Sequence, residues 1–451
     1  MMAGLALRPP LSFGQGEVSR TRLVLPTPAQ LAWQDCEIGI LYSFDLAIAA
    51  GDTTPNNASR NVWNPNLYQP AKLDTDQWIE AAKACGAKYA VFTATHFNGF
   101  MQWQSDAYPY GLRQTSWRGG KGDVVADFVA SCRKGGILPG LYFSVHRNVY
   151  HQVWSHYVNW GRGRGTAAQE KFNRIAEQQM TELCSKYGPL VQIWFDAGTK
   201  TPAEGGPDML PIFEKYQPDS VFYSSSQRSD HRWVGNEAGH AGTPCYATMP
   251  GPERGPLSHN SPVWKPYLHG GDPDGTVWSP AMVDIPLRGH NWFYKEGEDN
   301  RVSAPQGLMK KYYTSVGRNS NLLIGAVIKP DGTVPEADVT VLAGFGKLLR
   351  ERFENPLAVV KNQLTLDLPK PTEVDHVVLQ EQIEQGERVR DYIVEGRVGD
   401  TWVPLAQGQV IGHKWIYQFQ PQTVSQLRLR VLAPKAEPQI RLFACYRIGK
   451  D

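Results

Sequence analysis

The stretch LVQIWFDAG, residues 190–198, decides the fold class of this chain, together with KYAVFTATH at residues 88–96. Each is a nearly continuous run of apolar residues that ends in a polar one, Asp196 in the first and His96 in the second. Strands that are apolar on both faces are typical of a parallel sheet covered on both sides. The two stretches therefore predict buried parallel strands with Asp196 and His96 at their carboxyl ends.

Similar units recur along the first three quarters of the chain. Strands are predicted at 37–44, 88–95, 137–144, 190–195 and 220–224. Between them, apolar residues recur at helical spacing over 76–84, 123–134, 167–187 and 208–215, and again over 305–315 and 334–353. So many strand–helix units in one domain favour a (β/α)8-like barrel over an open sheet, and we assign residues 1–355 to this α/β barrel.

Two regions depart from this rhythm. Residues 238–292 are rich in Gly, Pro, His and Trp, which predicts long loops over one face of the barrel. After residue 355 the pattern changes to alternating apolar and polar residues, as in DHVVLQEQI and QLRLRVL. Residues 356–451 therefore predict a C-terminal antiparallel β-sandwich domain. Its role is either to support the barrel or to bind carbohydrate, and the sequence favours support.

Composition excludes several classes of protein. The 451 residues include 46 Lys+Arg and 44 Asp+Glu, a net charge of +2, with no basic run. This balance argues against nucleic acid or an anionic membrane as the partner. No apolar window approaches the ~18 residues of a membrane span. The start, MMAGLALRPPLSF, is a poor signal peptide, so the compartment stays open. One glycosylation sequon occurs, at Asn57.

Metal and cofactor chemistry has little support in the sequence. The six cysteines are widely spaced and never form a CxxC pair, so we expect most to be reduced core residues. His231, His240, His259 and His269 lie in predicted loops without ligand spacing. HExxH, Walker and GxSxG motifs are absent from the sequence. We therefore expect no metal and no organic cofactor.

Candidate catalytic groups follow from barrel geometry, because active sites lie at the carboxyl ends of barrel strands. Asp196 is the sharpest candidate, since an unpaired buried carboxylate costs several kcal/mol. The alternative is that it caps a loop or pairs with an arginine. Glu237, in RWVGNEAG, lies about one strand further around the barrel, and the alternative is a solvated loop residue. His96 and His146 end strands as well, either as sugar-binding or as core residues.

Two carboxylates on neighbouring strand ends suit glycoside cleavage, in which one acts as nucleophile or base and the other as acid. Aromatic faces pack on the apolar side of a sugar ring, and the predicted loops are rich in tryptophan. Any single tryptophan is more often a core residue than a sugar platform. Among them we select Trp103 and Trp292 as candidate substrate contacts.

The motifs together resemble glycoside hydrolase family 29, the α-L-fucosidases. The similarity is collinear over about residues 30–355 and includes DCEIGILYSFDL, the LDTDQWIEAAKACGAKYAVFTATHFNGFMQW segment, ELCSKYGPLVQIWFDAG, RWVGNEAG, NWFYKEGEDN and KKYYTSVGRNSNLLI. The resemblance implies a retaining exo-fucosidase that acts on fucosylated oligosaccharides or glycoconjugates. The GNE form resembles the subgroup selective for α-1,3 and α-1,4 linkages.

The resemblance also implies roles for individual residues. The nucleophile of the family's WFDG motif matches Asp196, although Ala197 replaces the usual glycine. Glu237 is the candidate acid/base. Trp194 and Tyr142 match sugar-contacting positions, and Arg232 resembles the family's sugar-binding arginine.

The chain departs from the family pattern at several positions. Ser43 stands where a family histidine contacts the sugar, Phe97 replaces one of two adjacent histidines, and Met282 stands in a PAMVD stretch that usually reads PAECD. Losing a sugar contact could cost ~1–3 kcal/mol. Two alternatives therefore stay open: an inactive, fucose-binding relative, or a retaining glycosidase for a related sugar such as α-L-galactose.

Overall fold

The computed structural model describes residues 23–52 and 60–449. The predicted sequon at Asn57 and the amino-terminal 22 residues, on which the signal-peptide prediction rests, lie outside the described residues. Within the described part, no helix is both long and apolar enough to cross a membrane. The six cysteines are all buried and unpaired, as expected for core residues.

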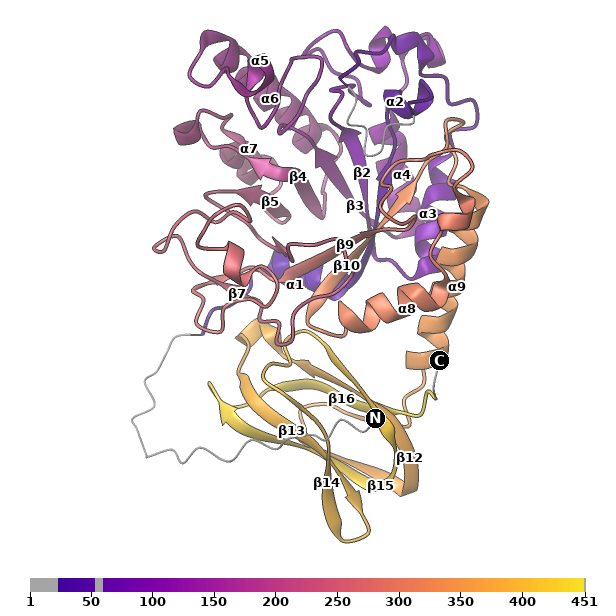
Figure 1. Cartoon of the computed structure of the whole chain (residues 1–451), viewed down its shortest axis with the longest axis vertical. Coiled ribbons are helices and arrows are strands. Elements are labelled where there is room, and N and C mark those ends of the chain that lie inside the picture. The colour runs from indigo at the N-terminus through magenta and orange to yellow at the C-terminus, as the bar shows by residue number, and fades with distance from the viewer. Residues whose placement is uncertain (1–22, 53–59, 450–451) are drawn as a thin grey trace.

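A parallel sheet of eight strands forms the centre of the larger domain (Figure 1). Its order is β5-β4-β3-β2-β1-β10-β9-β6. The strands are β1 (Ile38–Ser43), β2 (Tyr89–Thr95), β3 (Leu138–Phe143), β4 (Gln192–Thr199), β5 (Val221–Ser225), β6 (Arg232–Trp233), β9 (Ala281–Pro286) and β10 (Ser320–Val327). The predicted barrel is thus confirmed, and its five predicted strands are β1 to β5.

Asp230 brings the two outermost strands, β5 and β6, together. Its backbone N–H donates to the carbonyl of Phe222 at 3.0 Å, and its carboxylate accepts from the N–H of Phe222 at 2.7 Å. One of the two hydrogen bonds that join the strands here therefore comes from a side chain instead of from the backbone. The eight-stranded sheet is nearly closed into a barrel.

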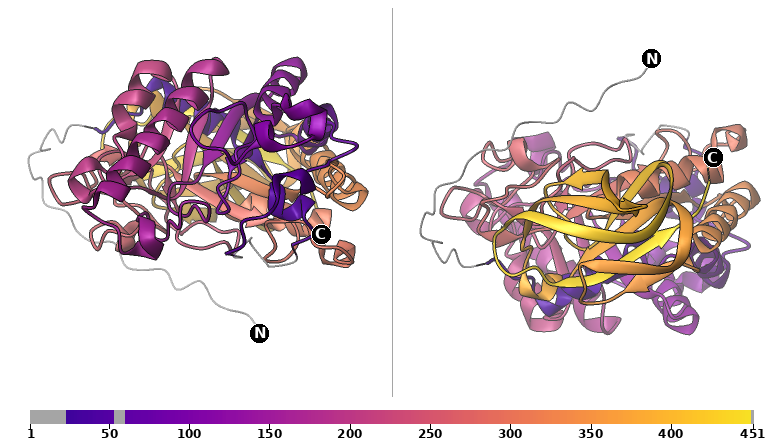
Figure 2. Two further views of the ribbon diagram at one scale, coloured as in Figure 1. Left: turned by 90° about the horizontal axis from the view of Figure 1, so that it is seen from above. Right: turned by 90° about the horizontal axis from the view of Figure 1, so that it is seen from below.

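Helices cover the outside of this sheet (Figure 2). They are α3 (Thr75–Cys85), α4 (Val124–Gly135), α6 (Ala167–Lys186), α7 (Met209–Tyr216), α8 (Pro305–Thr314) and α9 (Glu336–Phe353). The short helices α2 (Leu46–Ala49) and α5 (Val158–Gly161) lie beyond the carboxyl ends of the strands (Figure 1). Helices α3 and α4 have the same kinds of capping residue at both ends. Asp74 and Asp123 cap their amino ends, and left-handed Gly86 and Gly136 end them, which is why the sequence pattern located both so closely.

The interior of the barrel is a separate core from the layer between sheet and helices. It includes Leu41, Tyr89, Trp194 and Met282 from four strands, and Trp33 from α1 (Pro28–Cys36). The indole of Trp33 donates to Gln192 at 2.9 Å, at the start of β4. Helix α1 therefore closes the amino end of the barrel and leaves the carboxyl end open.

The region 238–292 contains more than the predicted loops. It includes the barrel strand β9 and an antiparallel pair formed by β7 (Thr248–Met249) and β8 (Val277–Trp278). The prediction missed β9 because AMVDIP is short, carries a charge and ends in proline. Its strand pairing comes from β10 and β6 on either side, which local sequence does not reveal.

The C-terminal domain is a six-stranded antiparallel sheet, as the alternating pattern predicts. Its strands are β11 (Ala358–Val360), β12 (Thr365–Glu381), β13 (Val389–Val398), β14 (Thr401–Gly408), β15 (Trp415–Pro434) and β16 (Ile440–Tyr446), in the order β11-β16-β12-β15-β13-β14. Strands β12 and β15 are long because their pairing continues through register shifts near Asp367 and Val374.

This sheet packs below the barrel, at the amino ends of its strands (Figure 1). Asn319, which precedes β10, donates to Glu387 at 2.6 Å and accepts from the N–H of His413 at 2.7 Å. Asp35, at the end of α1, also contacts His413, at 2.9 Å. The C-terminal domain therefore supports the end of the barrel opposite to the candidate site.

Candidate active site

A cavity of about 480 Å³ opens at the carboxyl end of the barrel. Most of the barrel strands, or the loops that follow them, contribute to its wall. Its lining consists of Leu41, Ser43, Thr93, His96, Phe97, Tyr142, Arg147, Trp194, Asp196, Ala197, Tyr223, Trp233, Glu237, His259, Asp284, Trp292 and Phe293. Seven of the ten predicted site residues therefore meet in one cavity.

Asp196 is presented where β4 leaves its regular pairing with β5. The register shifts after Trp194, and the next two residues after Asp196 adopt left-handed conformations, Ala197 with φ 57° and Gly198 with φ 75°. A Cβ on Gly198 would lie 3.0 Å from the carbonyl oxygen of Ser224, so this position needs glycine. Ala197 adopts this conformation despite having a Cβ, which is a strained arrangement at the point that aims Asp196.

The environment of Asp196 combines opposing influences. Burial raises the pKa of Asp196, and the negative charge of Glu237 adds to the rise, whereas a hydrogen bond from Tyr142 and the charge of Arg147 lower it. The Tyr142 hydroxyl donates to Oδ2 of Asp196 at 3.0 Å. The guanidinium of Arg147 stacks over Phe97, 4.7 Å from the ring centre. The Tyr142 hydroxyl and the Arg147 charge thus both favour the ionised carboxylate.

Glu237 lies on the exposed loop after β6. The indole of Trp292 donates to its Oε2 at 3.2 Å. Trp292 in turn packs directly over Gly325 of β10, where a Cβ would overlap the six-membered ring of the indole. A glycine in a neighbouring strand therefore sets the position of the tryptophan that contacts Glu237.

A third carboxylate, Asp284 on β9, lines the same cavity and was not selected from the sequence. It is buried, and its Oδ1 accepts a hydrogen bond of 2.7 Å from the indole of Trp233. Burial, followed by the negative charge of Glu237, raises the pKa of Asp284 from 3.8 to about 8. An acid within a missed strand carries little signal in the sequence, so only the fold brings it to the site.

His96 is an uncharged member of the wall. Burial, with a smaller contribution from the Arg147 charge, lowers the pKa of His96 from 6.5 to about 3. Its ring stacks on Phe97 at 4.0 Å and lies 4.6 Å from Phe293. A neutral imidazole can both donate and accept, which suits a sugar hydroxyl.

The indole N–H of Trp194 is a buried donor with no hydrogen-bond partner among the described residues, and it belongs to a cavity-lining side chain. Ser43, the last residue of β1, adds a hydroxyl to the same wall. Aromatic faces, unpaired donors and paired carboxylates are the features that a sugar-cleaving pocket requires.

The α-L-fucosidase family profile matches residues 57–354. The chain belongs to the α-L-fucosidase family, glycoside hydrolase family 29. It is similar to α-L-fucosidase 1 of Arabidopsis thaliana, with 28% identity over 94% of this chain and 88% of the plant protein. The crystal structure of an α-L-fucosidase homologue from Bacteroides thetaiotaomicron has 39% identity and a TM-score of 0.88, and covers 95% of this chain and 100% of that one.

A Ruminococcus gnavus fucosidase of the same glycoside hydrolase family, solved in complex with fucose, shares the fold with a TM-score of 0.80 at 21% identity. The superposition covers 94% of this chain and 95% of that one. The shared fold includes both the barrel and the C-terminal β domain. The protein is thus a glycoside hydrolase of the α-L-fucosidase type.

Arg232 does not face the cavity of this fucosidase, contrary to the expectation from the resemblance. It is fully buried and donates to the carbonyls of Leu268 at 3.0 Å and Ser279 at 2.6 Å. Arg232 and Trp233 are consecutive in β6, and successive side chains in a strand point to opposite faces. Trp233 takes the cavity side, so Arg232 holds the outer loops together.

Two further predicted contacts also lie outside the cavity lining. Trp103 is fully buried between sheet and helices and donates to Glu182 of α6 at 2.8 Å, so it is a core residue. His146 packs behind Phe97, with its ring 4.7 Å from that of His156. Its neighbour Arg147, which was not selected from the sequence, reaches the cavity instead.

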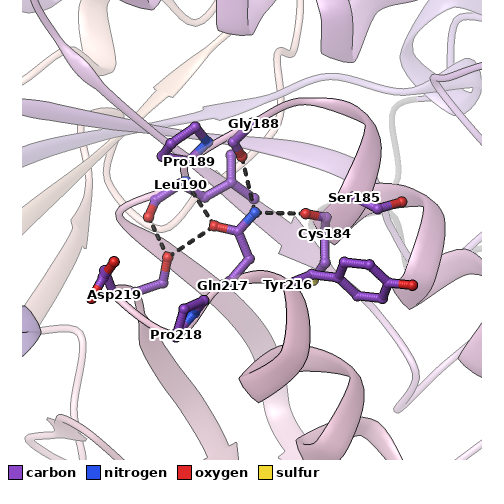
Figure 3. Close-up of a pocket in the computed structure, with 10 residues that line it drawn as sticks. Cys184, Ser185, Gly188, Pro189, Leu190, Tyr216, Gln217, Pro218 and Asp219 are labelled. Atoms are coloured by element: carbon purple, nitrogen blue, oxygen red, sulfur yellow. Dashed lines mark hydrogen bonds between the residues drawn. The ribbon is translucent and has the colours of Figure 1, made fainter.

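A second hollow, of about 260 Å³, lies at the amino ends of β4 and β5 (Figure 3). Its polar atoms are bonded to one another around Gln217, which donates to the carbonyls of Cys184 at 2.6 Å and Gly188 at 2.9 Å and accepts from the N–H of Leu190 at 2.9 Å. This network joins α6, α7 and the two strands. It is a structural feature of the fucosidase, at the end opposite to Asp196.

The four loop histidines have separate surroundings. His231 is sandwiched between Trp33 and Tyr223, 4.5 Å from each ring, and His259 lines the cavity. His240 and His269 pack against each other at 5.3 Å. Over residues 23–52 and 60–449, no three His, Cys, Asp or Glu side chains are grouped to hold a metal ion.

Proposed function

We propose that this chain is a retaining, exo-acting α-L-fucosidase in which Asp196 is the nucleophile and Glu237 the acid/base. The observation that carries the proposal is that both carboxylates line one cavity at the carboxyl end of the barrel. Burial raises the pKa of Asp196, and the charge of Glu237 adds to this rise. For a retaining enzyme we expect the two carboxyl groups to lie about 5–5.5 Å apart.

The reaction needs two displacements at the anomeric carbon. Asp196 forms a bond to this carbon as the bond to the departing oxygen breaks, and Glu237 gives that oxygen its proton. Water then attacks the same carbon, the bond to Asp196 breaks, and Glu237 takes the proton from the water. The hydrogen bond from Tyr142 and the charge of Arg147 favour the ionised form of Asp196 that the first step uses, against the effect of burial.

The proposed substrate is a terminal α-linked L-fucose on an oligosaccharide or glycoconjugate, with α-1,3 or α-1,4 linkage. The GNE sequence around Glu237 supports this linkage preference by its resemblance to the selective subgroup. Digestion of α-1,2, α-1,3, α-1,4 and α-1,6 fucosylated oligosaccharides tests it. Release from only the α-1,2 or α-1,6 compounds would contradict the preference.

Stereochemistry and azide rescue test the mechanism. By NMR, the wild type should first release the α-anomer of L-fucose. Asp196→Ala should lose turnover with an unchanged fold, and azide should restore it with a product of inverted configuration. Glu237→Ala with azide should give fucosyl azide of retained configuration. A β-anomer as the first product, or full activity in Asp196→Ala, would overturn the assignment.

A related sugar is the second candidate, favoured by Ser43 and Phe97 in the cavity wall, where the family has histidines. α-L-Galactose differs from fucose by one hydroxyl at carbon six. Comparison of kcat/KM for the two aryl glycosides decides between them. A clear preference for the galactoside would replace fucose as the sugar while leaving the two carboxylates in their roles.

A further inference from the structure

The cavity contains one more carboxyl group than the two displacements require. Asp196, Glu237 and Asp284 all line it, and Arg147 is the one lysine or arginine among the described lining residues. Three negative charges in one small space repel one another, so such a cluster holds protons more tightly than its members would separately. The proposed mechanism uses two of these groups and gives Asp284 no role.

The surroundings of Glu237 and Asp284 are opposite in character. Glu237 is on an exposed loop, where water solvates its charge, yet a general acid must keep its proton near neutral pH. Asp284 is 4% exposed, in the middle of β9, and pairs in register with Leu323 of β10. Glu237, which must donate the proton, is thus the solvated carboxyl group. Burial favours the protonated form of its neighbour Asp284.

The titratable groups that act on Asp284 come from four sides of the barrel. Asp196 lies on β4 and Glu237 on the loop after β6, and both charges favour the protonated form of Asp284. Tyr223 on β5 and Tyr89 on β2 belong to the same barrel interior; burial raises the pKa of both phenols, and the charge of Asp284 adds to the rise. The indole of Trp233 donates a hydrogen bond to the carboxylate of Asp284, and this bond favours the ionised form.

We propose that Asp284 is a positioning residue for the fucosidase reaction: Asp284 and Glu237 hold one proton between them, and Asp284 carries the negative charge when Glu237 carries the proton. The inference rests on the function proposed above for Glu237. In the active form Glu237 is neutral and Asp284 is a carboxylate bonded to Trp233. The negative charge that remains on the pair favours retention of this last proton until the leaving group takes it.

The proton balance is simple. Exchange between the two forms moves one proton from an oxygen of Asp284 to an oxygen of Glu237 through solvent, because Glu237 is exposed. The net charge of the pair stays at −1. Once the leaving oxygen accepts the proton, both carboxyls are ionised, and the attacking water restores the proton in the second step.

Asp284→Asn tests this directly, because asparagine keeps an oxygen for the Trp233 indole but cannot carry charge. Without a second carboxylate the pair no longer exists, so the last proton of the site should be lost at lower pH. For an unactivated substrate such as a fucosylated disaccharide, the alkaline limb of the kcat/KM profile should move down by about one pH unit, which is about a tenfold loss on that limb. A 4-nitrophenyl fucoside, whose leaving group needs little protonation, should lose less than about threefold.

Trp233→Phe provides a second variant with the opposite expectation. It removes the hydrogen bond that favours the Asp284 carboxylate, so the doubly ionised pair should form at higher pH and the alkaline limb should move up. Glu381→Gln is the matched control. Glu381 is another buried acid, with a pKa raised from 4.5 to about 7, but it lies in the C-terminal sheet and should leave the kcat/KM profile unchanged.

Several outcomes would overturn the proposal. An unchanged alkaline limb in Asp284→Asn, or equal losses on both substrates at every pH, would mean that Asp284 only shapes the cavity. Shifts in the same direction for Asp284→Asn and Trp233→Phe would also contradict it. If azide fails to rescue Glu237→Ala, the proposed function itself fails. If that rescue succeeds and the Asp284→Asn profile is unchanged, only the inference about Asp284 fails.

Discussion

The hydroxyl of Tyr142 donates a hydrogen bond of 3.0 Å to Oδ2 of Asp196, from one barrel strand to its neighbour. Tyr142 pairs in register with Trp194, and Asp196 lies two residues further along β4. Side chains two apart in a strand point to the same side, so the register brings the phenol to the carboxylate. The hydrogen bond orients the carboxylate of Asp196 and opposes the rise in its pKa that burial causes.

Tyr142→Phe should therefore weaken the fucosidase without unfolding it. A hydrogen bond to a charged group contributes about 1.5–3 kcal/mol, so we expect kcat/KM to fall about 10- to 100-fold. Because the bond lowers the pKa of Asp196, its loss should also move the acid limb of the kcat/KM profile to higher pH. Steady-state kinetics across pH check this, and an unchanged acid limb would show that the bond has no influence on Asp196.

Gly325→Ala should reduce activity through Trp292. The added Cβ would overlap the indole, which must then shift away from its hydrogen bond with Glu237. Overpacking of this kind costs about 1–3 kcal/mol, so the protein should still fold. We expect a larger loss of kcat/KM on a fucosylated disaccharide than on a 4-nitrophenyl fucoside.

Gly307→Ala is the matched control for this substitution. Gly307 lies in α8, and nothing lies within 4 Å of the position that its Cβ would take. Alanine there should raise the free energy of unfolding by up to about 1 kcal/mol, because glycine is the poorer helix former. Its kcat/KM should equal that of the wild type. Equal losses of activity in both variants would refute the role of Trp292.

Replacement by methionine should affect stability at Arg232 and activity at Arg147. Arg232→Met leaves the buried carbonyls of Leu268 and Ser279 without their donor, which should lower the free energy of unfolding by about 2–4 kcal/mol. KM of the folded fraction should be unchanged. Arg147→Met should instead lower kcat and leave stability nearly intact, because it removes a charge that lowers the pKa of Asp196. Urea unfolding and kinetics on both variants separate the two roles.

Asp284 should make the stability of the fucosidase depend on pH. In the unfolded chain this group loses its proton near pH 3.8, whereas in the folded protein it keeps the proton to about pH 8. Between these values ionisation favours the unfolded state, so the free energy of unfolding should decrease as pH rises and level off above about pH 8. Asp284→Asn removes this contribution.

The measurement is urea unfolding of the wild type and Asp284→Asn at about pH 5 and about pH 8. The free energy of unfolding of Asp284→Asn should exceed that of the wild type by a larger margin at the higher pH. The reason is that only the wild type has a buried carboxyl group whose ionisation favours the unfolded chain. A difference in unfolding free energy that is the same at both pH values would contradict the raised pKa of Asp284.

The sequence by itself determined the parallel barrel, the antiparallel C-terminal sheet and the position of Asp196. These follow from local patterns: apolar runs, helical spacing with caps at Asp74 and Asp123, and period-two alternation. Each pattern is a property of one segment and the solvent around it, so it can be read without knowing the segment's neighbours.

Only the tertiary structure decided which side chains reach the cavity. Arg232 and Trp233 are adjacent in sequence, yet one lies in the core and the other lines the site, because pairing with β9 fixes which face of β6 points inward. Asp284 and Arg147 reach the cavity for the same reason, through the register of strands and loops that are distant in sequence. A shift of one residue in such pairing exchanges the two faces, and local sequence contains no information about it.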